Sequence, residues 1–236
     1  MNEQTGAQQS SQATVRVILV TATAGFRHLS IPTVLRTMPE IAREAGNFSV
    51  KTLLAEVSDL DRLTAATLAE HDLLCLIHTS GDLPLSDEQK AAILDFVASG
   101  HGFVGVHGAT TICYDWLEYG AMLGGQFNGH PPASTFTVTV EDTGHPSTRH
   151  LPASFAVKDE LYTFRAKPRD TAHVLLSAPS GSLDLEGDLP LAWTKTHGAG
   201  RVYYNSLGHF DEAWEEPSFR AQIAGGLRWA AGLDAE

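Results

Sequence analysis

One short stretch, residues 102–110, constrains the fold of this chain more than any other. Its apolar run at residues 103–106 has the length and composition of a buried parallel strand, and it ends abruptly in His107-Gly108-Ala109. Small residues around one reactive side chain are typical of a nucleophile elbow, in which a strand turns sharply into a helix. The pattern therefore predicts that His107 stands exposed at the carboxyl end of a parallel sheet, where open α/β folds place their sites.

The charge balance limits the classes of partner that the chain can have. It has 28 acidic and 16 basic residues, which gives a formal net charge of −12, and no cluster of Lys or Arg is visible. Binding to a nucleic-acid backbone needs a basic face, so we expect no nucleic-acid partner. No apolar run approaches the roughly 20 residues of a membrane-spanning helix, so we expect no membrane partner either.

The first residues and the two cysteines favour a cytoplasmic protein. Residues 1–14 are polar and lack the apolar segment of a secretory signal, so we expect them to form a disordered tail. Cys75 and Cys113 do not make a disulfide framework. Cys75 lies in an apolar run, where a small core residue is expected.

Strand-like and helix-like patterns alternate up to residue 110. We expect buried strands at 15–21, 48–55, 72–78 and 103–106, with helices at 30–45, 60–69 and 86–99. Ser30 should cap the first of these helices and Pro39 should kink or break it. Ser86-Asp87-Glu88-Gln89 has the form of a capping box. Alternation of this kind predicts βαβ units and a parallel sheet.

The pattern changes beyond Trp116, where strands predominate. We expect a helix end at 119–123, strands at 135–141, 159–164, 173–178, 191–196 and 201–206, and a closing helix at 217–231. Gly198-Ala199-Gly200 should form the turn between the last two strands. Because the chain has no internal repeat and no convincing linker, we expect residues 15–236 to form a single domain with a mixed sheet.

Short motifs follow one another along the chain in a fixed order. They are Gly25-Phe26-Arg27-His28, the elbow strand 102–107, Gly124-Gly125-Gln126-Phe127, His130-Pro131, His145-Pro146, Asp159-Glu160-Leu161-Tyr162, Leu191-Ala192-Trp193, residues 200–204, Gly208-His209 and residues 229–232. This ordered set resembles the ThuA-like (trehalose-utilisation) family of the class I glutamine amidotransferase-like superfamily. The resemblance implies an α/β fold, namely a flavodoxin-like three-layer sandwich with a mostly parallel central sheet. It also implies a link to disaccharide or keto-sugar metabolism.

Comparison with the wider superfamily suggests acid–base chemistry without a nucleophile. Amidotransferases carry Cys at the elbow, where this chain has His107, and they carry a catalytic His followed two residues later by a carboxylate. His209 and Asp211 match the second pattern, as base and orienter. Imidazole is a poor acyl acceptor, so we expect no glutaminase activity. Cys113 lies six residues past the elbow as the alternative nucleophile, although nothing nearby in the sequence lowers its pKa.

Several residues from separate motifs are expected to meet in one crevice. His28, His107 and His209 each follow a strand, and in a doubly wound sheet these positions open onto the same carboxyl edge. We expect His130 and Glu160 to join them, with His28 and His130 binding the substrate. Tyr162 and Trp193 are expected to be core residues or sugar-stacking platforms. The histidines at positions 71, 101, 150, 173 and 197 are interpreted as surface or satisfied residues.

Two classes of function follow from this set of residues. The first is an enzyme (a hydrolase, lyase or isomerase) acting on a small-molecule sugar, with His107, His209 and Glu160 as acid–base groups. The second is a non-catalytic sugar-binding or interaction domain that has lost the amidotransferase nucleophile. Three imidazoles and one carboxylate would also suit Zn²⁺ or another divalent metal. The sequence does not identify the substrate, and it does not decide whether the chain binds a metal or forms a homo-oligomer.

Overall fold

Five parallel strands form the half of the sheet that positions the site. In the computed structural model, which describes residues 13–233, they are β1 (Val15–Val20), β2 (Phe48–Leu54), β3 (Leu73–Ile77), β4 (Gly102–Val106) and β11 (Gly200–Asn205). Their order is β2-β1-β3-β4-β11, and every neighbouring pair is parallel. β3 and β4 are buried at every position, which explains why their sequences are unbroken apolar runs.

Four antiparallel strands continue the same sheet beyond β11. They are β10 (Leu189–His197), β9 (His173–Ala178), β6 (Ser134–Val140) and β7 (Ser154–Asp159), in that order. A separate two-stranded sheet joins β5 (Phe127–Gly129) to β8 (Thr163–Phe164). The β10–β11 hairpin confirms the turn predicted at residues 198–200.

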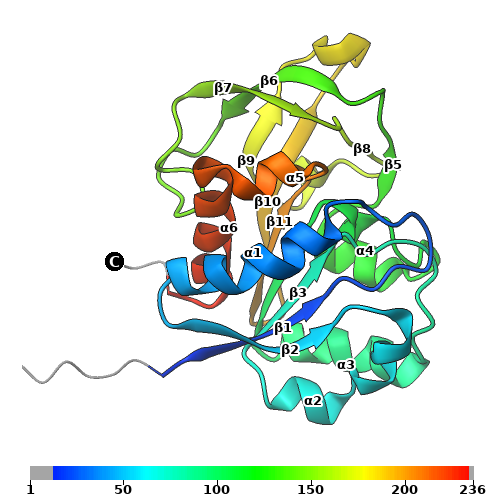
Figure 1. Ribbon diagram of the computed structural model, residues 1–236. Helices are drawn as coiled ribbons and strands as arrows, with labels where there is room; N and C mark the ends of the chain where they lie inside the picture. The colour runs from blue at the N-terminus through cyan, green and yellow to red at the C-terminus, as the bar shows by residue number, and fades with distance from the viewer. Residues whose placement is uncertain (1–12, 234–236) are drawn as a thin grey trace, which may run out of the picture.

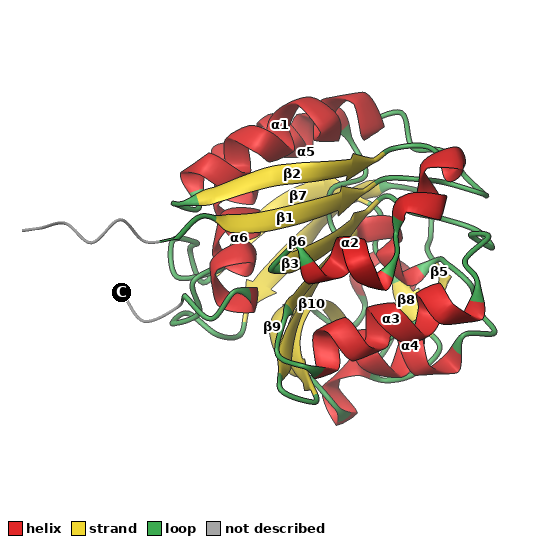
Figure 2. Ribbon diagram, turned by 90° about the horizontal axis from the view of Figure 1, so that it is seen from below, coloured by secondary structure: helices red, strands yellow, loops and turns green. Residues whose placement is uncertain are grey.

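Helices cover both faces of the sheet (Figures 1 and 2). One face carries α1 (Ile31–Glu44), α5 (Asp211–Glu215) and α6 (Pro217–Ala230), and the other carries α2 (Ala65–Ala69), α3 (Asp87–Ala98) and α4 (Leu117–Leu123). The short 3-10 helices are η1 (Val57–Arg62), η2 (His107–Thr110), η3 (Pro168–Asp170) and η4 (Ser182–Asp184). Alternate residues of β1 enter different cores, Val17 and Leu19 on the α1 side, Ile18 and Val20 on the α3 side.

Helix α1 differs from the prediction at two residues. It runs unbroken through Pro39, whose ring lies on the exposed face, where water can satisfy the backbone carbonyl of Leu35 that loses its partner. The Ser30 side chain makes no capping hydrogen bond to the helix. Its hydroxyl instead donates to the carbonyl oxygen of His209 at 2.7 Å and lies 3.1 Å from Nε2 of His78. The Ser30 side chain therefore contacts residues of the site and does not cap the helix.

Two other segments also depart from their predicted outlines. The helix expected at 60–69 is divided into η1 and α2 by a new cap, in which the Thr64 hydroxyl accepts from the Thr67 N–H. The strand expected at 159–164 starts earlier, because β7 ends at Asp159 and the chain then leaves the main sheet before β8. The capping box at Ser86 is confirmed.

Two further expectations concern the first residues of the chain and a membrane partner. Residues 1–12 of the predicted disordered tail lie outside the described part of the chain. Among residues 13–233, no helix combines the length and the hydropathy needed to span a membrane.

Candidate active site

Three adjacent parallel strands end together at one edge of the sheet. Ile77 of β3 pairs with Val106 of β4, and Val106 pairs with Asn205 of β11. The next residue in each strand is therefore His78, His107 or Ser206, and these three residues leave the sheet side by side. The loops after β1 and β11 bring His28 and His209 to the same place, with ring centroids 4.8 and 5.3 Å from that of His107.

The predicted elbow is confirmed at His107. Strand β4 ends at Val106, η2 begins at His107, and His107 has a φ of 51°. A Cβ atom on Gly108 would come within 2.6 Å of the Thr79 carbonyl oxygen, which explains why a glycine follows the histidine. The expectation of an exposed imidazole is wrong, because His107 is 0% exposed. The rings of His28, Tyr162 and His209 pack around it.

Hydrogen bonds fix the orientation and the tautomer of His107. Its Nδ1 lies 2.7 Å from the carbonyl oxygen of Ser206, and since a carbonyl can only accept, Nδ1 carries the hydrogen. In the neutral ring Nε2 is then an acceptor, and the Tyr162 hydroxyl donates to it at 2.8 Å. The backbone thus holds one side of the imidazole and aims its lone pair into the site.

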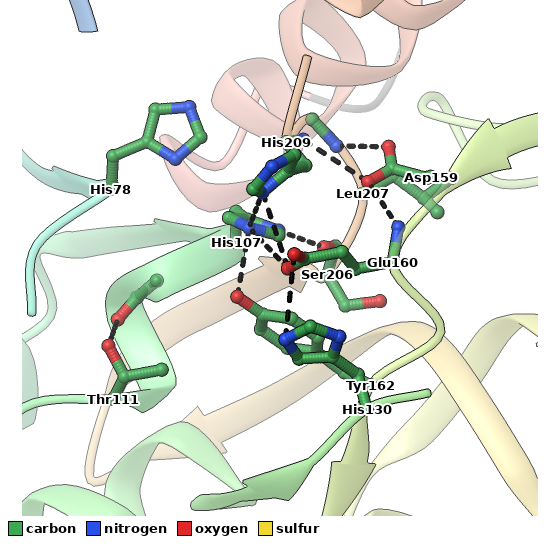
Figure 3. A network of polar contacts seen from close by, with 12 residues as sticks. His78, His107, Thr111, His130, Asp159, Glu160, Tyr162, Ser206, Leu207 and His209 are labelled. Carbon is green, nitrogen blue, oxygen red and sulfur yellow. Dashed lines mark hydrogen bonds and ion pairs between the residues drawn. The ribbon is translucent and has the colours of Figure 1, made fainter. Parts of the chain in front are cut away.

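Glu160 is the residue on which the other groups converge (Figure 3). Its Oε2 lies 3.4 Å from Nε2 of His107 and 3.3 Å from Nδ1 of His209. Its Oε1 lies 3.5 Å from Nε2 of His130. One carboxylate therefore faces three imidazoles that come from three distant segments of the chain.

Asp159 holds the two sides of the site together. Its Oδ2 accepts the Gly208 N–H at 2.7 Å, and its Oδ1 accepts the N–H groups of Glu160 at 2.8 Å and His209 at 3.2 Å. Neither carboxylate lies at a solvated edge, because Asp159 is 0% exposed and Glu160 is 8% exposed. The loop after β11 folds over the end of β7 and covers Asp159.

The pKa shifts in this cluster have opposite directions. Burial opposes ionisation of Glu160, but the His107 and His209 rings beside the carboxylate outweigh burial and hold the pKa of Glu160 well below its usual value. Burial likewise opposes charge on His209, yet the hydrogen bond with Glu160 raises the pKa of His209. Burial and the nearby His107 lower the pKa of His28 to about 3, and the same causes lower the pKa of His78 well below its usual value. The cluster favours a carboxylate–imidazolium pair beside two neutral imidazoles.

Glu160 and His28 reach a cavity of about 440 Å³. The remaining lining residues are glycines, aromatic residues and small polar residues: Gly25, Phe26, Ser80, Gly81, Thr111, Tyr114, Phe127, His130 and Tyr162. A second cavity of about 450 Å³ lies between β7, α5 and α6, but no histidine lines it. Of these two cavities, the first is the one that Glu160 and histidines line.

Comparison with known proteins identifies the family. The family model described as ThuA, trehalose utilisation, matches residues 16–230. The chain belongs to the ThuA family. A ThuA-like protein from Bacteroides uniformis has a TM-score of 0.75 and 20% identity, covering 98% of this chain and 97% of that one. A ThuA-like protein from Parabacteroides merdae has a TM-score of 0.78 and 20% identity, covering 95% and 92%.

A more distant structure supports the predicted fold class. A protein described as a GMP synthase component, from Thermoplasma acidophilum, has a TM-score of 0.57 and 13% identity, covering 93% of this chain and 96% of that one. The class I glutamine amidotransferase-like α/β fold is thus confirmed for this ThuA chain. The comparison with curated proteins finds no significant match.

Two residues predicted for the site lie elsewhere in the ThuA chain. Asp211 begins α5 and its Oδ1 accepts the Thr33 hydroxyl at 2.5 Å, so the carboxylate that faces the His209 ring is that of Glu160. Trp193 is fully buried in β10, where its Nε1 donates to the Leu123 carbonyl oxygen at 2.8 Å. Asp211 is therefore not the orienter, and Trp193 is a core residue rather than a sugar platform.

Sequence reasoning missed His78, whose ring packs against those of His28 and His107. It is 0% exposed, has a φ of 55°, and stacks on His28 at a centroid distance of 4.5 Å. One signal could have found it, because His78 ends the strand pattern of β3 as His107 ends that of β4. The structure does bring together His28, His107, His130, Glu160, Tyr162 and His209, while their roles in catalysis and binding stay predictions.

We expect the ThuA chain to release no ammonia from glutamine, because no thiolate is available at the elbow. Cys113 is buried, its Sγ lies 3.6 Å from the Leu83 carbonyl oxygen, and burial raises its pKa. Cys75 is 0% exposed. Ammonia release and intact mass after treatment with a glutamine-mimicking electrophile check this expectation. Stoichiometric labelling of Cys113 would contradict it.

Proposed function

We propose that this ThuA-family protein is an enzyme that moves a proton on a small keto-sugar or other disaccharide derivative, without glutaminase activity. The observation that carries the proposal is the convergence of His107 Nε2 and His209 Nδ1 on one oxygen of Glu160, beside a cavity. A positioned carboxylate and imidazoles are the groups that general acid–base catalysis uses most.

The arrangement suits removal of a proton from a carbon next to a carbonyl group. Glu160 offers an acceptor, and the Tyr162 hydroxyl, 2.8 Å from His107, offers a donor within the same cluster. Such a pair can take a proton from carbon while giving one to the carbonyl oxygen. Isomerisation and elimination both begin with this step, so both remain within the proposal.

Ordinary glycoside hydrolysis fits the same residues less well. That reaction uses two carboxyl groups on opposite sides of the scissile bond. Both oxygens of Asp159 are already occupied by backbone N–H groups. Among the described residues that line the cavity, Glu160 alone carries a carboxylate. Proton transfer is therefore favoured over displacement.

The cavity itself supports a sugar-sized substrate. Phe26, Tyr114, Phe127 and Tyr162 give it aromatic walls, which suit the apolar faces of a sugar ring. The volume of about 440 Å³ lies in the range of small-molecule sites. The description of the family as trehalose utilisation agrees with this substrate class.

A deuterium-exchange experiment tests the proposal without knowledge of the product. The protein is incubated in D₂O with a panel of disaccharides and their 3-keto forms, and deuterium next to the carbonyl is followed by mass spectrometry and NMR. We expect exchange with at least one keto-sugar and its loss in His209→Ala, which removes one of the converging imidazoles.

The control for this experiment is His197→Ala, which should behave as the wild type. His197 ends β10 beside Gly200, and Gly200 lies at the opposite edge of the sheet from the site. Saturable sugar binding with no exchange for any compound would favour the alternative, a non-catalytic sugar-binding domain.

A further inference from the structure

Three donor atoms in the site form a nearly equilateral triangle. Nε2 of His107, Nδ1 of His209 and Oε2 of Glu160 are separated by 3.3 Å between the two nitrogens, 3.4 Å between His107 and Glu160, and 3.3 Å between His209 and Glu160. All three come from different segments, so no local helical or strand spacing imposes these equal separations.

The separations are longer than those of charge-assisted hydrogen bonds and match the spacing of ligand atoms around one ion. A hydrogen bond between a charged imidazole and a carboxylate is about 2.7–2.9 Å long. A tetrahedral ion with bonds of about 2.0–2.2 Å separates its ligand atoms by about 3.3–3.6 Å. Every side of the observed triangle falls in the second range. A His₂Glu set that leaves a fourth position open is also a known catalytic zinc arrangement.

Hydrogen bonds orient the three residues of the triangle, as they commonly do for metal ligands. A ligating imidazole usually donates its other N–H to a carbonyl or carboxylate, and His107 donates Nδ1–H to the Ser206 carbonyl oxygen. Asp159 accepts the backbone N–H groups of both Glu160 and His209, which fixes the two residues relative to each other. These contacts hold the ligand atoms in place before any ion arrives.

We propose that His107 Nε2, His209 Nδ1 and Glu160 Oε2 bind one divalent transition-metal ion of the Zn²⁺ class. Imidazole and carboxylate ligands suit Zn²⁺, Mn²⁺, Fe²⁺ and Co²⁺. A second histidine set, His28, His78 and His107, shares His107 with the first set and contains no carboxylate.

A bound ion would change which residues transfer protons in the proposed reaction. If Nε2 of His107 held an ion, its lone pair would no longer accept from the Tyr162 hydroxyl, and that hydroxyl would be free to donate elsewhere. A bound ion would supply Lewis acidity toward a carbonyl oxygen. Proton transfer then falls to Tyr162 and to His130, which contacts the other oxygen of Glu160. This catalytic role rests on the proposed function, whereas binding of the ion does not.

Metal binding is measured on the full chain, purified without a histidine tag and stripped with a chelator. Calorimetric titration with Zn²⁺ and Mn²⁺, together with elemental analysis, should give one ion per chain for the wild type. His107→Ala, His209→Ala and Glu160→Gln should each lose more than about 100-fold in affinity, because a ligand matters more than the groups behind it. His197→Ala should retain the wild-type affinity.

Two further measurements keep the outcome clear if a variant is unstable. Far-UV circular dichroism confirms the fold of each variant, and Glu160→Gln preserves side-chain volume. The absorption of tetrahedral Co²⁺ should appear in the wild type and disappear in Glu160→Gln. Wild-type protein that binds no ion, or Glu160→Gln and His209→Ala that bind as tightly as the wild type, would overturn the metal site. Deuterium exchange by metal-free protein would support the proposed function without the metal site. Metal binding without deuterium exchange would support the metal site but not the proposed function.

Discussion

A Glu160→Gln variant will process the sugar substrate about a thousandfold more slowly than the wild-type protein, since a positioned acid–base group contributes about 10²–10⁴-fold. The amide keeps the shape of the side chain but can neither accept a proton nor balance a charged imidazole. His107, His130 and His209 would all lose the carboxylate that they face. The measurement is kcat/KM for deuterium exchange, or for product formation once the substrate is known.

The matched control for this variant is Glu118→Gln. Glu118 is an exposed residue in the first turn of α4, so its substitution should leave kcat/KM unchanged. Circular dichroism and thermal unfolding separate a loss of chemistry from a loss of fold. Activity of Glu160→Gln within tenfold of the wild type would remove Glu160 from the mechanism.

Lowering the pH from 7 to 5 will remove about 2 kcal/mol of folding free energy through His28 alone. In the folded protein, burial and then repulsion from His107 and His209 lower the pKa of His28 from 6.5 to about 3. Glu160 opposes this shift and His130 adds to it. Between the two pKa values the unfolded chain holds a proton that the folded chain does not. The contribution is therefore complete above about pH 6.5 and is lost progressively toward pH 3.

Urea unfolding of chelator-treated protein at pH 7 and pH 5 measures this effect. The difference in unfolding free energy between the two pH values should be about 2 kcal/mol smaller in His28→Gln than in the wild type. The pKa of His78 is lowered for the same reasons, so the variant should keep part of the wild-type dependence. His197→Gln should keep all of it. Equal pH dependence in His28→Gln and wild type would show that His28 does not resist protonation in the folded state.

The sequence predicts the part of the site that depends on topology. His28, His107 and His209 follow strands that read as parallel, and the carboxyl ends of such strands meet at one edge. The elbow follows from the same rule together with the small residues around His107. These inferences need only the order of the elements, which apolar periodicity gives reliably.

The sequence fails where side-chain direction depends on tertiary packing. The spacing of Asp211 suggests an orienter for His209, but α5 begins at Asp211 and directs its carboxylate to Thr33 of α1. Trp193 has the residue type of a sugar platform, but it lies within β10 opposite Tyr204 rather than at the edge of the sheet. Asp159 is buried because the loop after β11 covers it, a contact between residues about fifty positions apart.

The position of β11 has a consequence for synthesis in the cell. β11 is the last strand along residues 13–233, yet it lies between β4 and β10 and joins the parallel half of the sheet to the antiparallel half. While the ribosome is still adding residues before Gly200, β4 and β10 each have an open edge, and open edges pair readily with other chains. His209 emerges later still. A nascent chain that stalls before Gly200 would therefore leave the edges of β4 and β10 unpaired and would lack His209.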